Sequence, residues 1–186
     1  MNEIETKTLK NTKKEMSWLT FFVFLVLIVL FRIFILEPHS VSGSSMDNTF
    51  KNGDYVLVDK ISYKFITPKK GDVIVFNPPK DVNNKNRFIK RIIATPGDNI
   101  YVNENGTYIN NDLINEDFVT FKSNKASENI LLKTDEYFVM GDNRTVSYDS
   151  RYWGPINKDE IQGRVLIRLY PFNKISIFPG LKEYNK

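Results

Sequence analysis

The sequence predicts a mainly β protein, in which an N-terminal transmembrane helix precedes an antiparallel-sheet core with a smaller inserted β subdomain. Three observations support this fold class. A charge-free apolar run lies near the N-terminus. The remaining chain contains short segments rich in valine, isoleucine and aromatic residues, bounded by glycine, proline, asparagine or aspartate as strands usually are. No long helical repeat of apolar residues follows the N-terminal run.

The predicted transmembrane helix covers residues 16–36. Residues 16–31 carry no charged side chain, and apolar residues continue from Ile33 to Leu36 beyond Arg32. About 20 residues, at about 1.5 Å each, cross the ~30 Å hydrocarbon core of a bilayer. A cleaved signal peptide is the alternative, but its apolar core would be shorter, and a buried core helix would not be apolar on every face.

Lysine residues are distributed unequally around this apolar segment. Four precede it, and the next lysine after it is Lys51; the four are Lys7, Lys10, Lys13 and Lys14. Basic residues are retained on the cytoplasmic side of a membrane. We therefore expect a single-pass protein of the cell membrane, with a cytoplasmic tail over residues 1–15 and an extracellular domain after Leu36. The lipid bilayer is one expected partner.

The strands expected in the outer domain define a core and an insertion. They cover residues 54–63, 71–77, 87–93, 101–109, 136–141 and 164–170. Asn105-Gly106 is typical of a hairpin turn. The segment 100–135 is rich in asparagine, glutamate and lysine and poor in aliphatic residues, which favours an inserted cap subdomain. The core then consists of residues 37–99 and 136–186.

The composition excludes several classes of chemistry. The chain has no cysteine and one histidine, His39, so disulfides, thiolate chemistry and histidine-rich metal sites are excluded. No glycine pattern typical of nucleotide binding is present. The net charge is only +4 and lysines alternate with acidic residues, so no nucleic-acid partner is expected. We expect neither a metal nor a cofactor.

A reactive serine requires a base, and one lysine is a candidate. Residues 40–50, SVSGSSMDNTF, contain four serines, but a serine hydroxyl is a weak nucleophile without a base in hydrogen-bond reach. His39 lies beside the expected membrane exit, which favours a lysine or a carboxylate as the base. In the predicted strand FIKRII, alternation places Lys90 between Phe88 and Ile92 on one face, where burial favours a neutral amine. The same pattern also fits an edge-strand lysine that reaches solvent.

The segment 140–154, MGDNRTVSYDSRYWG, is densely polar between a predicted strand and a tryptophan. Its seven polar side chains are those of Asp142, Asn143, Arg144, Ser147, Asp149, Ser150 and Arg151. Such a set suits a hydrogen-bonded framework that fixes neighbouring strands and orients a reactive group. A solvent-exposed turn is the alternative.

Five blocks in order resemble the bacterial type I signal peptidases, which are membrane-anchored serine proteases with a serine/lysine pair. The blocks are the apolar anchor, GSSMDNTF, GDVIVFNPP, RFIKRIIATPGD and GDNRTVSYDSR, and they cover nearly the whole chain. The resemblance implies that Ser45, immediately before Met46, is the nucleophile and that Lys90 is the general base. Ser147 corresponds to a family serine whose hydroxyl helps to orient the lysine amine.

The resemblance also assigns supporting residues. Asp149 and Arg151 correspond to a structural ion pair of the family, while Asp142 and Arg91 correspond to a second pair. Gly43 stands where Gram-negative members have a serine that stabilises the oxyanion, and Gram-positive members also have glycine there. Backbone N–H groups, that of Ser45 among them, would then stabilise the oxyanion.

Four residues depart from the family pattern. Asn48 and Phe50 stand where proline and leucine are usual, and Ala94 and Thr95 replace a common glycine and an apolar residue. Proline fixes φ near about −65°, so Asn48 is expected to leave the turn after the nucleophile looser. None of the four changes removes a member of the catalytic pair.

The function implied by the resemblance is removal of signal peptides from secretory preproteins after small residues at positions −1 and −3. A non-catalytic relative that acts in assembly or as a chaperone, for example in pilus biogenesis, is the alternative, although such relatives can lack the serine or the lysine. A self-cleaving cytosolic repressor would have an N-terminal DNA-binding domain where this chain has an apolar segment.

Overall fold

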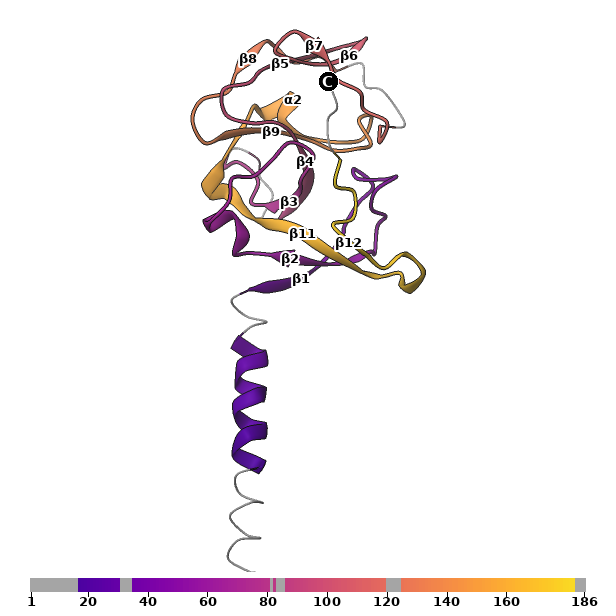
Figure 1. The fold of residues 1–186 in the computed structure, drawn as a ribbon. Helices are drawn as coiled ribbons and strands as arrows, with labels where there is room; N and C mark the ends of the chain where they lie inside the picture. The colour runs from indigo at the N-terminus through magenta and orange to yellow at the C-terminus, as the bar shows by residue number, and fades with distance from the viewer. Residues whose placement is uncertain (1–16, 31–34, 81, 83–85, 120–124, 183–186) are drawn as a thin grey trace, which may run out of the picture. The chain divides into compact units, whose positions relative to one another are not determined.

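The computed structural model describes residues 17–30, 35–80, 82, 86–119 and 125–182 (Figure 1). Residues 17–30 form an α-helix with exposed apolar side chains. Within the described part of the chain, no helix reaches the length and apolarity that a membrane crossing requires. The expected tail, residues 1–15, and residues 16 and 31–34 of the expected span lie outside the described residues. Leu36, expected at the end of this helix, instead begins strand β1.

Residues 38–186 form one compact unit that contains two antiparallel sheets. The larger sheet has eight strands in the order β1-β2-β11-β3-β4-β9-β10, with β12 paired to β11; the smaller has the order β7-β6-β5-β8. The strands are β1 Leu36–Ser40, β2 Tyr55–Asp59, β3 Val73–Phe76, β4 Phe88–Ala94, β5 Asn99–Asn103, β6 Gly106–Ile109, β7 Asp112–Leu113, β8 Ile130–Leu131, β9 Glu136–Met140, β10 Ile156–Asn157, β11 Ile161–Tyr170 and β12 Ser176–Ile177. The short helices are η1 Ser62–Lys64, α2 Ser150–Trp153, η2 Lys158–Glu160 and η3 Phe172–Lys174.

Strand β2 is shorter than the expected segment 54–63 because a side chain closes a turn after it. The carboxylate of Asp59 accepts hydrogen bonds from the backbone N–H groups of Ile61 and Ser62, both at 3.0 Å. Aspartate commonly stabilises turns in this way. The chain therefore leaves the sheet and enters η1.

The centre of the larger sheet is buried on both faces. All four residues of β3 are buried, and they alternate between two apolar clusters: Val73 and Val75 belong to one, Ile74 and Phe76 to the other. A strand covered on both faces has a continuous apolar sequence rather than an alternating one. The register pairs Ile74 with Lys90 of β4, which places a lysine at the centre of the buried sheet.

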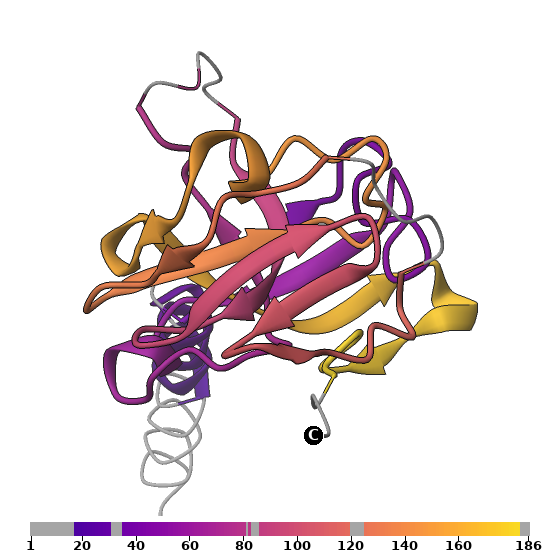
Figure 2. The ribbon, with the colours of Figure 1, turned by 90° about the horizontal axis from the view of Figure 1, so that it is seen from above.

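The smaller sheet lies over one part of the larger sheet, as the views in Figures 1 and 2 agree. A third apolar cluster joins Ile93 and Phe138 of the larger sheet to Ile100 and Ile109 of the smaller. The segment 100–135, expected to be an inserted cap, contributes most of the smaller sheet.

Candidate active site

Ser45 lies in a turn that two apolar side chains fix to the core. Met46 and Phe50 are fully buried in the cluster that also contains Val41. The backbone N–H of Phe50 donates to the carbonyl of Met46 at 2.8 Å, which closes the turn. Ser45 itself is half-buried. The apolar residues thus hold the backbone while the serine side chain faces a cleft.

Lys90 approaches this turn from strand β4, and it is 5% exposed. Its Nζ lies 2.7 Å from Ser45 Oγ and 5.5 Å from the centroid of the Phe88 ring. Phe88 and Ile92 pack in one apolar cluster, as the alternation predicted. The alternative of a lysine that reaches solvent from an edge strand is wrong, because β4 lies between β3 and β9.

Burial decides the electrostatics of Lys90. Loss of water around the ammonium lowers the pKa of Lys90 from 10.5 to about 8. The negative charges of Asp149 and Asp142 oppose this shift without cancelling it. A substantial fraction of the amine is therefore neutral near pH 8, and a neutral amine beside a hydroxyl can accept its proton.

The loop after β9 packs directly against the serine turn. The backbone N–H of Asn143 donates to the carbonyl of Ser45 at 3.0 Å. At Gly141 a Cβ atom would lie 2.4 Å from both the Ser45 carbonyl oxygen and Ser147 Oγ, so only glycine fits there. The sequence analysis missed this role of Gly141, although the residue opens the GDNR block.

A fully buried ion pair joins β4 to the same loop. Arg91 donates from Nε and Nη2 to the two carboxylate oxygens of Asp142, at 2.8 and 2.6 Å. Arg91 also donates to the carbonyls of Gly71, at 2.9 Å, and Gly180. The Thr49 hydroxyl donates to Asp142, which connects the serine turn to the pair. The resemblance selected Arg91 and Asp142, but it did not indicate Thr49.

The second expected pair, Asp149 and Arg151, lies at the end of the loop. Arg151 donates from Nε and Nη2 to the two Asp149 oxygens, both at 2.8 Å. Asp149 also caps α2 by accepting from the Arg151 backbone N–H, and it accepts from the Gly141 backbone N–H at 3.1 Å. One buried carboxylate thus fixes both ends of the loop 141–149.

Two further expected site residues, Ser147 and Gly43, form no hydrogen bond to Ser45 or Lys90 among the described residues. Ser147 is buried, and its Oγ makes no hydrogen bond among the described residues. Its expected contact with the Lys90 amine is therefore not formed in this structure. Gly43 lies beside Ser45 on the cleft surface, and its N–H donates to the Asn52 side chain at 2.9 Å.

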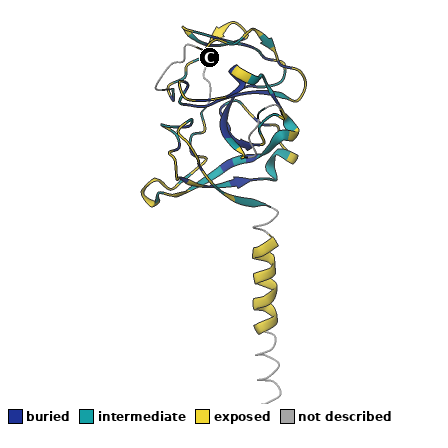
Figure 3. Ribbon diagram, turned by 180° about the vertical axis from the view of Figure 1, so that it is seen from behind, coloured by how far each residue is buried: buried dark blue, intermediate teal, exposed yellow. Residues whose placement is uncertain are grey.

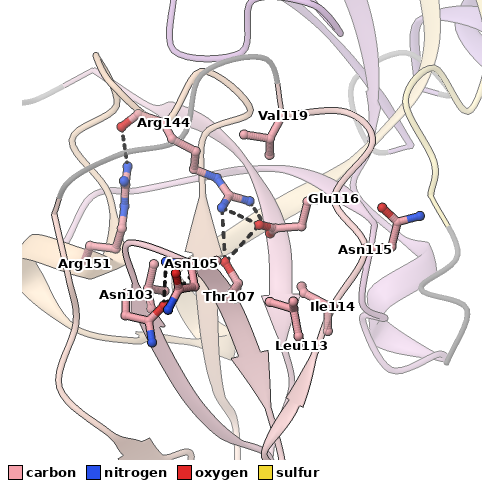
Figure 4. A pocket seen from close by; sticks show the side chains of 12 residues that line it. Asn103, Asn105, Thr107, Leu113, Ile114, Asn115, Glu116, Val119, Arg144 and Arg151 are labelled. Carbon is pink, nitrogen blue, oxygen red and sulfur yellow. Dashed lines mark hydrogen bonds and ion pairs between the residues drawn. The ribbon is translucent and has the colours of Figure 1, made fainter.

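Arg144 connects the loop to the smaller sheet, a link that the sequence analysis did not predict (Figure 4). Its guanidinium donates to Glu116 at 2.9 Å and to the Thr107 hydroxyl at 3.2 Å, and its Nε donates to the Gly141 carbonyl at 3.0 Å. Glu116 lies in a segment without periodic apolar residues. No feature of the sequence predicts that Glu116 contacts Arg144.

Asn48, expected to loosen the serine turn, has a φ of 90°. Proline cannot adopt this angle, because its ring fixes φ near about −65°. The Asn48 amide donates to the Phe118 carbonyl at 3.2 Å. The turn therefore differs in conformation from one with proline at this position, while its looseness stays a prediction.

Ser45 and Lys90 line a cleft of about 320 Å³. His39, expected beside the membrane exit, is half-buried and also lines this cleft. The rest of the lining consists of Ser42, Gly43, Ser44, Arg87, Phe88, Ile89, Val146 and Tyr148. A substrate carbonyl in this cleft would lie beside the Ser45 hydroxyl, the Lys90 amine and the backbone N–H groups of the serine turn. Acyl transfer requires these three kinds of group, as nucleophile, base and oxyanion donors.

Comparison with known proteins gives matches over most of the chain. A family model described as signal peptidase, peptidase S26, matches residues 15–170. The probable signal peptidase I-2 of Synechocystis is 33% identical over 93% of this chain and 83% of its own length. Signal peptidase IB of Staphylococcus aureus is 31% identical over 87% of this chain and 93% of its own length. A crystal structure of a signal peptidase I from Enterococcus faecalis is 28% identical, with a TM-score of 0.44 over 54% of this chain and 97% of that chain.

Proposed function

This chain belongs to the peptidase S26 family of signal peptidases, and on that premise we propose that it removes signal peptides by a mechanism based on Ser45 and Lys90. It is a serine endopeptidase, a hydrolase that cleaves within the polypeptide chain. The observation that carries the mechanism is the 2.7 Å separation between the Ser45 hydroxyl and the buried Lys90 amine.

In the first half-reaction neutral Lys90 takes the proton of Ser45 as Oγ attacks the scissile carbonyl carbon. Backbone N–H groups at the serine turn, that of Ser45 among them, stabilise the oxyanion of the tetrahedral intermediate. The intermediate collapses to an acyl-enzyme, and the Lys90 ammonium protonates the leaving amine. In the second half-reaction Lys90 activates a water molecule, which hydrolyses the ester and restores the free serine.

The two buried ion pairs have a positioning role in this proposal. Arg91–Asp142 and Arg151–Asp149 fix the loop that packs against Ser45. Ser147 supports the lysine by hydrogen bonding when the amine moves toward it. Its hydroxyl is buried and has no hydrogen-bond partner among the described residues, so it is available for a bond that forms during turnover.

The substrates are secretory preproteins with small residues at positions −1 and −3. The resemblance supports this substrate class, as do the relatives named signal peptidases. The alternative of a non-catalytic assembly or chaperone module is not favoured, because serine and lysine are both present and lie within hydrogen-bond distance.

The test uses the full chain in detergent and a peptide with an Ala-x-Ala sequence before a defined bond. We expect one cut, immediately after the second alanine, which mass spectrometry identifies. A matched peptide with Glu-x-Glu should stay intact. If both peptides stay intact, or if both are cut, the proposed substrate class is wrong.

The residues after the apolar segment are proposed to lie outside the cell membrane. The four lysines before that segment and the length of the apolar run support this arrangement. Protease added to intact protoplasts should digest residues after about 40 and spare the N-terminal tail. An epitope tag at each end allows both fragments to be detected, and protection of the C-terminal tag would reverse the orientation.

A further inference from the structure

The catalytic cleft has a second wall that the mechanism does not use. Residues 42–45 and 87–90 supply most of the lining, and Val146 and Tyr148 supply a separate part, which we call the second wall. Both belong to the loop between β9 and α2. They are 57% and 50% exposed, although Ser147 between them and Asp149 after them are buried. An apolar side chain exposed at the edge of a cleft is available to contact a ligand.

The Tyr148 ring is fixed in place by a series of aromatic contacts. It packs edge-on against Trp153, with ring centroids 4.7 Å apart, and against Tyr152 at 5.0 Å. Trp153 in turn packs against Phe88 at 5.9 Å. These contacts hold the exposed ring in place before any ligand arrives. A preorganised aromatic surface contributes contact area at little cost in conformational entropy.

The position of Lys90 indicates which half of the substrate this wall would contact. The loop 141–149 packs against Ser45 through the Asn143 N–H, and its Asp142 and Asp149 are the negative charges that act on the Lys90 amine. The Lys90 amine therefore interacts with both the serine turn and this loop. A general acid must be within hydrogen-bond reach of the leaving nitrogen. The chain that follows the cut is thus expected on the loop side, and the acyl half on the side of residues 42–44.

We propose that Tyr148, with Val146 beside it, is a specificity-determining residue for the leaving-group side of the substrate and favours an aromatic or aliphatic side chain at position +1. This inference rests on the proposed function of Ser45 and Lys90. The ligand class follows from the surface: an aromatic face and a branched aliphatic side chain offer dispersion contact and no charged partner. The acyl-side preference for small residues is independent of this wall.

The test is a peptide series cut by the full chain in detergent. All peptides share Ala-x-Ala before the cut and carry phenylalanine, leucine, alanine or aspartate at +1. For Tyr148→Ala we expect kcat/KM to fall roughly five- to tenfold on the phenylalanine and leucine peptides, and less than about twofold on the alanine peptide. Tyr148→Phe keeps the ring and should restore the wild-type preference.

Tyr55→Ala is the matched control, because this ring is 52% exposed and packs against Tyr170, and Tyr55 is not among the residues that line the cleft. It should leave the +1 preference unchanged. Thermal unfolding of each variant identifies a general loss of stability. If Tyr148→Ala unfolds, Tyr148→Leu replaces it and should weaken the preference for phenylalanine while keeping that for leucine.

An equal loss on all four peptides, or a change in preference at −1 or −3, would overturn the inference. So would a shift in the +1 preference caused by Tyr55→Ala. Failure of the proposed function is a different result, because wild-type enzyme would then cut none of the peptides. If wild type and Tyr148→Ala both cut all four peptides and neither distinguishes among the +1 residues, this inference alone is rejected.

Discussion

The two sheets of residues 38–186 are packed in different ways, and the difference explains where a lysine can lose its charge. Strand β3 of the larger sheet is buried along its whole length, whereas buried and half-buried residues alternate along β5 of the smaller sheet (Figure 3). On β5 and β6, Tyr101 and Tyr108 stack at 4.6 Å, both only half-buried. Only a sheet covered on both faces can desolvate an amine such as that of Lys90.

The smaller sheet therefore contributes support rather than reacting groups. Its region supplies Glu116 and Thr107 to Arg144, and the Phe118 carbonyl to Asn48. The larger sheet and its loops supply the groups that would react. This division predicts a graded series of mutational effects, largest in the larger sheet.

Ser45→Ala is expected to have the largest effect, because it removes the nucleophile. Cleavage should fall by at least about 10³-fold, while the circular dichroism spectrum and the unfolding temperature stay close to wild type. Ser42→Ala and Ser44→Ala are controls from the same cleft and should keep most activity. Preprotein processing by Ser45→Ala at a near wild-type rate would show that the nucleophile is elsewhere.

Lys90→Arg should also be inactive although it keeps a positive charge, because a guanidinium stays protonated at any working pH. In the wild-type enzyme kcat/KM should rise with pH along a limb near pH 8, where the Lys90 amine becomes neutral. His39→Ala, in the same cleft, should leave this limb in place and cost little activity. Substantial activity in Lys90→Arg, or loss of the limb in His39→Ala, contradicts the lysine mechanism.

Arg91→Met should destabilise the fold by about 3–5 kcal/mol, because it leaves the Asp142 carboxylate buried without a partner. Chemical denaturation measures this free energy of unfolding. Lys70→Met is the control: it removes the partly exposed pair with Asp98 and should cost less than about 1 kcal/mol. If the two variants lose similar amounts of unfolding free energy, the buried pair is no more important for stability than the partly exposed one, and the prediction is wrong.

Lys90→Met should stabilise the fold while it abolishes activity. The unfolded chain binds a proton on Lys90 up to its ordinary pKa, but the folded chain releases it near pH 8, so wild-type stability rises with pH between about 8 and 10.4. The gain in the variant should be roughly 3 kcal/mol below pH 8 and should disappear above pH 10.4. Denaturation of both proteins across this pH range measures the difference, and a gain independent of pH would contradict this account.

Glu116→Gln should have the smallest effect of the five. The carboxylate accepts from Arg144, which in turn donates to the Gly141 carbonyl, so its loss should lower kcat a few-fold and stability by about 1–2 kcal/mol. Glu128→Gln, at an exposed position of the same region, is the control and should change neither. A loss of activity as large as that of Ser45→Ala would mean that the smaller sheet does more than support the loop.

The sequence predicts the centre of this fold well, because the local pattern and the packing agree there. VIVF in β3 is a continuous apolar run, and in FIKRII of β4 apolar residues flank Lys90 and Arg91; both strands are buried almost throughout, as strands covered on both faces are. Among the residues selected by the resemblance, Ser45 and Lys90 are in hydrogen-bond distance, and the two arginine–aspartate pairs belong to the loop that packs against the serine turn or bond to it.

Other features depend on long-range packing that no local pattern encodes. Glu116 reaches Arg144 only because the smaller sheet folds over the loop. The φ of 90° at Asn48 depends on an acceptor 70 residues away, the Phe118 carbonyl. β2 ends early because the Asp59 side chain forms a turn, although Asp59 lies inside a segment, DYVLVDKISY, whose composition is typical of a strand.

The close approach at Gly141 also has a consequence for resistance to inhibitors. Consider a compound that acylates Ser45 and depends on the spacing between the serine turn and this loop. Mutations of the protein at Gly141 would rarely give resistance to it. Every substitution at Gly141 adds a Cβ atom 2.4 Å from the Ser45 carbonyl oxygen, so a change that weakens the inhibitor there also displaces the nucleophile. Resistance is expected instead from substitutions in the second wall of the cleft, Val146 and Tyr148, whose exposed side chains can change without moving Ser45.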